Sequence, residues 1–312
     1  MGENPGTQAV AILLCTHNGA RFLEEQLDSL ERQTHVHWRV WASDDASSDA
    51  TLEVLARYQQ RWGADRLSIR PGPGRGFVAN FLSLACDTGI EADYFCFCDQ
   101  DDIWDADKLA RALAWHQGLH TDLPALYCGR TRLIDDDGKP IGFSPLFKRP
   151  PSFQNAMVQS IAGGNTMVFN QAARGLLAEA GPDVSLVTHD WWLYILVSGC
   201  GGSVRYDPVP AISYRQHVRN VVGSNATWRA RFNRARLLMQ GRFTEMNRLN
   251  LVALTRVEHR MAKPSHDVLE AFSQARQAGL MGRIAAAMRS GVYHHTFLGK
   301  MGLIVATLFK KL

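Results

Sequence analysis

The sequence predicts an α/β fold in which a mostly parallel sheet is flanked by helices. Two observations lead to this prediction. Short apolar runs that read as buried strands alternate with amphipathic helical patterns along residues 10–130, and such alternation is typical of right-handed β-α-β units. A cluster of polar residues follows nearly every apolar run, which is where ligands bind in sheets of this kind.

The elements follow in order from these patterns. The first strand is expected at residues 10–15, an unbroken apolar run that ends at Thr16-His17-Asn18-Gly19. Apolar residues at helical spacing predict helices at 22–30, 52–58, 77–86, 106–118 and 191–197, and short apolar runs predict strands at 38–41, 67–70, 94–98 and 125–130. Residues 160–170 are expected to form a loop that leads into a further strand.

The C-terminal part differs in charge from the rest of the chain. Residues 225–312 hold 15 Lys and Arg against 4 Asp and Glu, whereas residues 1–224 hold 19 against 26. We therefore expect a domain at residues 1–224 followed by a basic helical region at residues 225–312.

Two partners suit this basic region. The segment 297–312 mixes apolar residues with lysines, which favours a platform on an anionic membrane surface. The alternative is a packing or dimerisation region with a solvated basic face, which would make the protein a homo-oligomer. Nucleic acid is not expected as a partner, because no aromatic residues are interleaved with the arginines in a recognisable module.

The most informative run is Phe95-Cys96-Phe97-Cys98-Asp99-Gln100-Asp101-Asp102, in which three carboxylates lie at the tip of an apolar strand. Charges this close repel one another unless something positive lies nearby. Carboxylate oxygens suit Mg²⁺ or Mn²⁺, which commonly bridge to substrate phosphates. One interpretation is a metal–nucleotide site, and the other is an acidic loop in which Asp102 caps the following helix.

Asp190 is a second acid of interest. Thr188 is placed to cap the helix at 191–197, which puts Asp190 in its first turn. A carboxylate is favoured there by the helix dipole. Asp190 is therefore either a surface acid that complements the dipole or a catalytic acid.

Composition points to the cytoplasm. The six cysteines lack the paired spacing of a zinc site, and no signal-peptide pattern is present. No stretch reaches the ~18 apolar residues that a membrane-spanning helix requires. We expect a cytoplasmic protein, either free or held on the inner face of the membrane.

Four motifs, in order, resemble those of the family 2 inverting glycosyltransferases. Ile12-Leu13-Leu14-Cys15-Thr16-His17-Asn18 resembles the opening strand and its Thr-x-Asn turn. Ser43-Asp44-Asp45-Ala46-Ser47-Ser48-Asp49-Ala50-Thr51 resembles the Asp-Asp-Gly-Ser-x-Asp-x-Thr run, with Ala46 in place of Gly. Asp99-Gln100-Asp101-Asp102 resembles the Asp-x-Asp metal motif, and His189-Asp190-Trp191-Trp192 resembles the motif that supplies the catalytic base. The resemblance covers residues 8 to about 222 and implies the GT-A fold, which is Rossmann-like.

The resemblance implies a nucleotide-diphosphate sugar as donor and Mg²⁺ or Mn²⁺ as cofactor. The nucleotide-binding residues would be Thr16, Asn18, Asp44, Asp45, Arg75, Asn80 and Asp99. The metal ligands would be Asp99, Asp101 and His217. A solvated Arg75, a helix-capping Asn80 and a structural His217 are the alternatives.

Asp190 would be the general base, because inversion requires a carboxylate that takes the proton of the attacking hydroxyl on the face opposite the leaving diphosphate. Gly163, Gly164 and Asn165 would lie beside the sugar. Trp191 and Trp192 would stack on an acceptor sugar, although helical spacing puts one of them in the core.

The phrases Asp99-Gln100-Asp101-Asp102-Ile103-Trp104 and Tyr214-Arg215-Gln216-His217 are most similar to those of rhamnosyltransferase-type members. These act in surface-polysaccharide assembly, and the acceptor would be a saccharide or a lipid-linked saccharide. The Gln-x-x-Arg-Trp motif of processive synthases is missing from the sequence, which favours transfer of a single sugar. The alternatives are a UDP-hexose donor and a non-catalytic scaffold that binds nucleotide sugars.

Overall fold

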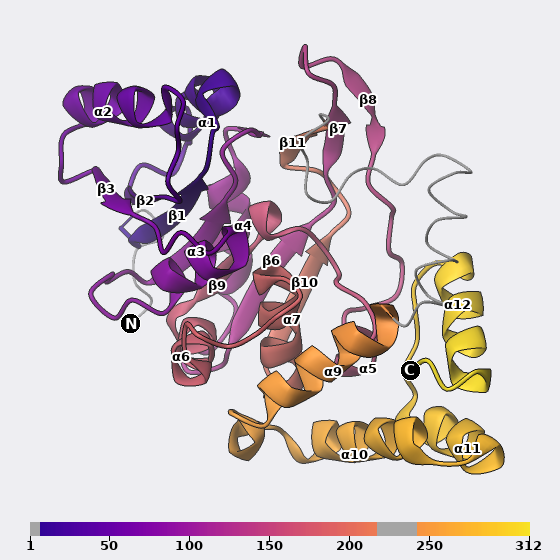
Figure 1. The fold of residues 1–312 in the computed structure, drawn as a ribbon. Helices are drawn as coiled ribbons and strands as arrows, with labels where there is room; N and C mark the ends of the chain where they lie inside the picture. The colour runs from indigo at the N-terminus through magenta and orange to yellow at the C-terminus, as the bar shows by residue number, and fades with distance from the viewer. Residues whose placement is uncertain (1–6, 217–241) are drawn as a thin grey trace.

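The computed structural model describes residues 7–216 and 242–312. Its centre is a seven-stranded sheet with the order β10-β6-β9-β4-β1-β2-β3 (Figure 1). The strands are β1 Val10–Thr16, β2 Trp38–Asp44, β3 Leu67–Pro71, β4 Tyr94–Cys98, β6 Ala125–Gly129, β9 Val168–Asn170 and β10 Ser203–Asp207. Only β9 runs antiparallel to its neighbours, β4 and β6. The predicted α/β fold with a mostly parallel sheet is confirmed.

Helices cover both faces of this sheet. They are α1 Ala20–Glu31, α2 Thr51–Trp62, α3 Phe77–Ala85, α4 Lys108–His116, α5 Phe153–Ala156, α6 Gln171–Ala180 and α7 His189–Gly199. Side chains along β1 alternate between the two cores. Ile12 packs into the core that includes residues of α1, α2 and α4, and Leu13 packs into the core that includes residues of α3, α6 and α7. This two-residue period is what a strand buried on both faces requires.

A second, four-stranded sheet was not predicted. It has the order β5-β11-β7-β8 and consists of β5 Ile103–Trp104, β11 Ile212–Arg215, β7 Arg132–Ile134 and β8 Pro140–Phe143. Its strands are only two to four residues long, so they carry little periodicity. β5 begins directly after Asp102, and this small sheet therefore fixes the path of the acidic run.

The C-terminal helices are α9 Arg242–Leu254, α10 Lys263–Gln277, α11 Leu280–Ser290 and α12 Phe297–Leu308. They extend from the lower edge of the α/β part to its side (Figure 1). Phe272 of α10 belongs to the same hydrophobic core as α6 and α7, and the Arg256 side chain donates to the carbonyl of Ala180 at 2.8 Å. The expected boundary after residue 224 lies outside the described residues. Among the described helices, none combines the length and the apolar character needed to cross a bilayer.

Candidate active site

The loops after β1 and β2 are joined by hydrogen bonds around Asp44. Thr16 Oγ1 donates to Asp44 Oδ1 at 2.8 Å, and Ser47 donates to the same carboxylate from its hydroxyl at 2.6 Å and from its amide at 2.9 Å. Asn18 Oδ1 accepts from the amide of Ser48 at 2.8 Å. The structure thus brings Thr16, Asn18 and Asp44 together at one edge of the sheet, as predicted. Their contact with a nucleotide stays a prediction.

Ala46 adopts a left-handed backbone conformation, with φ of 63°. This is the position where the resembling motif has Gly. An L-residue pays a steric cost of about 1–2 kcal/mol in this region, whereas Gly does not. The turn that carries Asp44 and Ser47 is therefore strained at one residue.

Replacing Ala46 with Gly is expected to leave the protein as stable as before or to stabilise it by up to about 1 kcal/mol. The reason is that the free energy gained by relieving the strain is at least as large as the free-energy cost of the extra backbone entropy that Gly loses on folding. Urea unfolding monitored by circular dichroism measures the change. The control is Ala114→Gly, at an exposed position inside α4, which should destabilise the protein by about 1 kcal/mol. An equal loss of stability in both variants would contradict the claim that Ala46 is strained.

Asp45 holds the glycine-rich loop that follows β3. Its Oδ1 accepts from the amide of Gly74 at 2.6 Å and its Oδ2 from the amide of Gly76 at 2.8 Å. Both carboxylate oxygens therefore fix the backbone of this loop. Arg75, in the same loop, extends to an exposed ion pair with Asp183 at 3.0 Å. Contact of Asp45 or Arg75 with a nucleotide stays a prediction.

Asn80 was expected either to reach the nucleotide or to cap a helix, and the structure contradicts both. It lies inside α3, and it is 1% exposed. Its Oδ1 accepts from Ser43 Oγ at 2.5 Å and its Nδ2 donates to the carbonyl of Ser43 at 2.9 Å. Asn80 is buried and its side-chain amide is hydrogen-bonded through both its oxygen and its nitrogen, so it links α3 to the end of β2.

The side chains of the acidic run after β4, residues 99–102, have different environments. Gln100 clamps the backbone of His17, accepting from its amide at 2.8 Å and donating to its carbonyl at 3.1 Å. Asp102 is completely buried. It accepts from Asn165 Nδ2 at 2.6 Å and from the amide of Arg215 at 3.2 Å. Asp99 and Asp101 keep partial exposure to solvent.

These contacts correct two expectations. Asp102 does not cap the following helix, because α4 begins only at Lys108 and Asp107 occupies the capping position. Asn165 does not face a sugar, because its amide is buried against Asp102. Gln100 was missed, although its place between the two aspartates of the Asp-x-Asp motif could have drawn attention to it.

Negative charge is concentrated at Asp99. Burial, and after it the charges of Asp101 and Asp190, raise the pKa of the Asp99 carboxyl to about 7. Burial and the charges of Asp101 and Asp99 also raise the pKa of Asp102 well above its usual range. Asp101 and Asp190 therefore both lie close enough to Asp99 to repel its charge.

A divalent cation fits this chemistry, since carboxylate oxygens are the ligands that Mg²⁺ and Mn²⁺ prefer and a cation would relieve the repulsion. Within residues 7–216 and 242–312, no three His, Cys, Asp or Glu side chains are already arranged as a metal site. The expected ligand His217 lies outside the described residues. The metal role of Asp99 and Asp101 stays a prediction.

Replacing Asp99 with Asn is expected to stabilise the metal-free protein by about 1–3 kcal/mol at pH 8. The pKa of Asp99 is raised from 3.8 to about 7, so the ionised carboxylate destabilises the folded state. The gain should be complete above about pH 8, shrink as the pH falls through about 7, and vanish below about pH 3, where the carboxyl is protonated in both states. Urea unfolding across this range measures it. A gain that does not vary with pH, or an equal gain from the exposed Asp122→Asn, would contradict the explanation.

Asp190 lies in the first turn of α7, half-buried, with Thr188 at the capping position. Its Oδ2 accepts from the amide of Gly164 at 3.1 Å and its Oδ1 from the amide of Trp191 at 2.6 Å. The two amides hold both carboxylate oxygens in place at the N-terminus of α7. Gly163 and Gly164 thus lie beside Asp190, and their contact with a sugar stays a prediction.

His189 packs directly beneath this loop. Its ring stacks on Phe81 at 4.0 Å and meets Phe97 edge-on at 4.5 Å, and burial lowers its pKa to about 4. A Cβ on Gly164 would lie 2.6 Å from His189 Nε2. The close approach of the ring explains why a glycine stands at position 164.

The expected stacking of Trp191 and Trp192 on an acceptor sugar is contradicted. Trp191 is 4% exposed and donates from Nε1 to the carbonyl of Ala156 at 2.6 Å, and Trp192 is fully buried. Helix α7 is apolar on nearly all sides and runs through the core, so both indoles are packed rather than one.

Arg215 is the main residue that the sequence did not single out. Its side chain is 1% exposed at the end of β11. The guanidinium donates to the carbonyl of Asp101 at 3.1 Å, to the carbonyl of Asp136 at 2.9 Å and to Glu25 at 2.7 Å, and it lies over the Phe22 ring at 4.4 Å. One buried cation therefore joins α1, the acidic run and the β7–β8 turn.

Comparisons with known proteins agree with this geometry. The family model for glycosyl transferase family 2 matches residues 11–178. The dTDP-rhamnosyl transferase RfbG of Shigella flexneri is 30% identical over 236 residues, which are 72% of this chain and 78% of that protein.

Two solved structures share the fold. TarS 1–349 of S. aureus, in complex with UDP, has a TM-score of 0.53 and 16% identity over 87% of this chain and 74% of that one. The mannosyltransferase PcManGT of Pyrobaculum calidifontis, in complex with GDP-Man and Mn²⁺, has a TM-score of 0.51 and 17% identity over 98% of this chain and 88% of that one. At these identities the likeness concerns the fold alone.

Proposed function

The chain belongs to glycosyl transferase family 2, and from this premise we propose that it transfers rhamnose from dTDP-rhamnose, with inversion, to a saccharide acceptor. The family and the GT-A fold predicted from the sequence are confirmed. One observation carries the proposed chemistry. The half-buried Asp190 lies at the start of α7 and within electrostatic reach of Asp99.

The donor is inferred from similarity. RfbG, named as a dTDP-rhamnosyl transferase, is similar over most of both chains. A UDP-hexose is the alternative donor, because a solved structure of the same fold was obtained with UDP. The joined loops around Asp44 would bind the nucleotide in either case.

Asp190 would act as the general base. The acceptor oxygen forms a bond to the anomeric carbon while the bond from that carbon to the phosphate oxygen breaks. The hydroxyl proton passes to Asp190, and a nucleoside diphosphate leaves on the opposite face. The amide of Gly164 at 3.1 Å holds one carboxylate oxygen in place. A positioned base of this kind contributes roughly 10²–10⁴-fold to the rate.

Asp99 and Asp101 would hold Mg²⁺ or Mn²⁺, and His217 is a further candidate ligand. When bound, the cation would neutralise the charge that develops on the departing diphosphate. Arg215 would keep the Asp101 backbone in place through its bond to the Asp101 carbonyl, 3.1 Å long. The Mn²⁺ in the mannosyltransferase structure supports this proposal.

The acceptor would be a saccharide or lipid-linked saccharide used in surface-polysaccharide assembly. This part of the proposal rests on the similarity to rhamnosyltransferase-type members.

Calorimetric titration with dTDP, UDP and GDP, each with Mn²⁺ and with EDTA, tests the proposal. We expect dTDP to bind in the presence of Mn²⁺ and to bind at least about tenfold more weakly in EDTA. Stronger binding of UDP or GDP would overturn the dTDP donor. Binding unaffected by EDTA would overturn the metal role, and binding of none by the folded protein would overturn the enzyme proposal.

A further inference from the structure

Helix α12 turns an apolar stripe toward solvent. Phe297, Met301, Ile304 and Leu308 recur at the spacing of one helix face and are 75%, 44%, 52% and 44% exposed. The buried residues of α12 are the small side chains Ala306 and Thr307. These four large apolar residues therefore point away from the protein, whereas an ordinary surface helix buries its apolar face; Leu303 alone among the leucines of α12 packs against the core.

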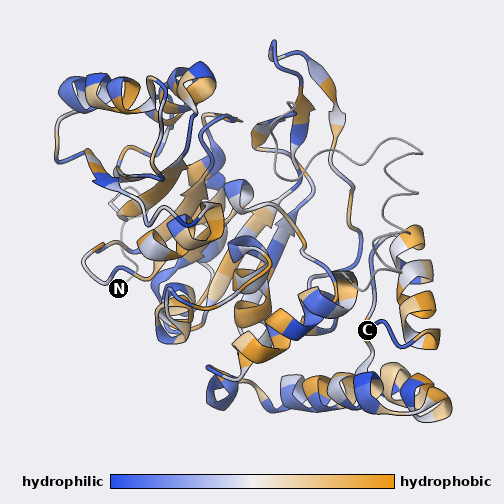
Figure 2. Cartoon of the chain, viewed as in Figure 1, coloured by the Kyte–Doolittle hydropathy of each residue, from blue (hydrophilic) through white to orange (hydrophobic). Residues whose placement is uncertain are grey.

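Helix α11 also exposes large apolar side chains. Met281 and Met288, two turns apart, are 80% and 77% exposed. Arg283 donates to the carbonyls of Thr307 and Leu308 at 3.1 and 3.0 Å, which ties α11 to the end of α12. We call Met281, Met288, Phe297, Met301, Ile304 and Leu308 the α11–α12 face. Figure 2 shows many hydrophobic residues along both helices.

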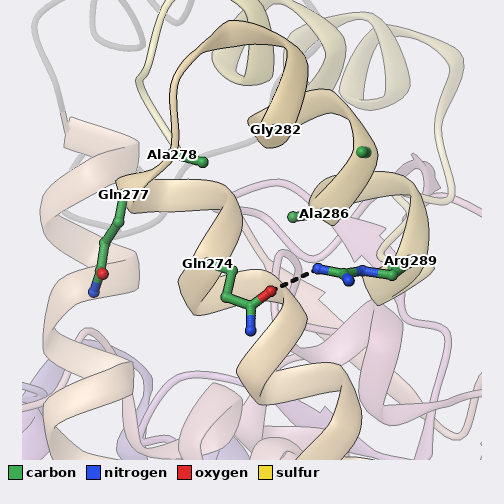
Figure 3. A pocket seen from close by; sticks show the side chains of 7 residues that line it. Gln274, Gln277, Ala278, Gly282, Ala286 and Arg289 are labelled. Carbon is green, nitrogen blue, oxygen red and sulfur yellow. Dashed lines mark hydrogen bonds between the residues drawn. The ribbon is translucent and has the colours of Figure 1, made fainter.

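On its other side α11 packs on α10 across a groove of about 640 Å³. Figure 3 shows Arg289 reaching across this groove to Gln274, at 2.6 Å. The groove is lined mainly by small residues such as Ala278, Gly282 and Ala286. Because α11 is anchored to both α10 and α12, the exposed methionines belong to a structured platform.

The charge around the α11–α12 face is of one sign. Residues 271–312 include six Lys and Arg and no Asp or Glu. Lys300, within α12, and Lys310, just after its end, are exposed. A second copy of this face would bring like charges together, which disfavours self-association. An anionic lipid surface supplies both a hydrophobic phase and the opposite charge.

We propose that the α11–α12 face docks on an anionic lipid bilayer, with its apolar side chains in the interface and its lysines at the headgroups. This proposal rests on the proposed function and deepens it. A lipid-linked acceptor would lie in the same bilayer on which the protein docks.

Co-sedimentation with vesicles tests the docking. The full-length protein is expected to sediment with an equimolar mixture of phosphatidylcholine and phosphatidylglycerol, and at least about tenfold less with phosphatidylcholine alone. Ile304→Glu should weaken sedimentation with the mixed vesicles by about tenfold or more. Val252→Glu, at a 57% exposed position of α9, is the matched control and should behave as the unchanged protein. Lys300→Gln should weaken binding about fivefold.

No binding to mixed vesicles, or equal loss in the Val252→Glu control, would overturn the proposal. So would a dimer, seen by analytical ultracentrifugation without lipid, that Ile304→Glu dissociates. Calorimetric binding of dTDP without vesicles is measured on the same samples. If the unchanged protein binds dTDP but does not sediment with the mixed vesicles, the docking alone is refuted. If the unchanged protein sediments with the vesicles but does not bind dTDP, the proposed donor alone is refuted.

Discussion

Replacing Asp190 with Asn is expected to lower kcat about 10³-fold while the Kd for the donor nucleotide stays within about twofold. The amide oxygen of Asn can still accept from the Gly164 amide, as Asp190 Oδ2 does at 3.1 Å, so the contact with the Gly163-Gly164 loop should persist. The Nδ2 of Asn cannot replace Oδ1, which accepts from the Trp191 amide at 2.6 Å. What is lost is the group that takes the proton. Release of nucleoside diphosphate measures kcat, and calorimetry measures Kd.

Asp122→Asn is the matched control, because it makes the same change at an exposed position in the loop before β6. It should leave kcat unchanged. If Asp190→Asn retained most of its activity, Asp190 would be no more than an acid that complements the helix dipole. A protein that binds nucleotide sugars but shows no turnover in either form would be a scaffold.

Replacing Arg215 with Met is expected to destabilise the protein by about 2–4 kcal/mol, because buried polar groups left without a partner cost about 1–3 kcal/mol each. Met has a similar length, but it leaves Glu25 and the carbonyls of Asp101 and Asp136 without the donor that joins them. Arg215→Lys keeps the charge but lacks the planar fork that reaches several acceptors, so an intermediate loss is expected. Urea unfolding monitored by circular dichroism measures both variants.

The exposed Arg205→Met, on β10, is the control and should change the stability by no more than about 0.5 kcal/mol. A catalytic readout separates positioning from stability alone. At a temperature where Arg215→Lys remains folded, its kcat should fall, because the backbone of Asp101 loses its tether. Full kcat in a folded Arg215→Lys would contradict the positioning role.

Much of the candidate site could be predicted because its residues stand at the ends of apolar runs. The carboxyl ends of neighbouring parallel strands lie at the same edge of a sheet. Thr16, Asp44 and Asp99 therefore had to lie near one another once β1, β2 and β4 were recognised. The same argument says nothing of which side chains turn inward. Asn80 and Trp192 were misjudged for that reason, since both are buried by α3 and α7 packing on the sheet.

The sequence by itself determined the α/β class, the positions of the main strands along the chain and the acidic edge of the sheet. These depend on local hydrophobic period and on chain order, which short segments carry. Only the tertiary structure decided that Asp102 is completely buried while Asp99 and Asp101 stay partly exposed. The reason is that Asp102 bonds to the amide of Arg215, 113 residues away. It also decided that α12 points its apolar stripe outward, because the face that a helix buries depends on what packs against it.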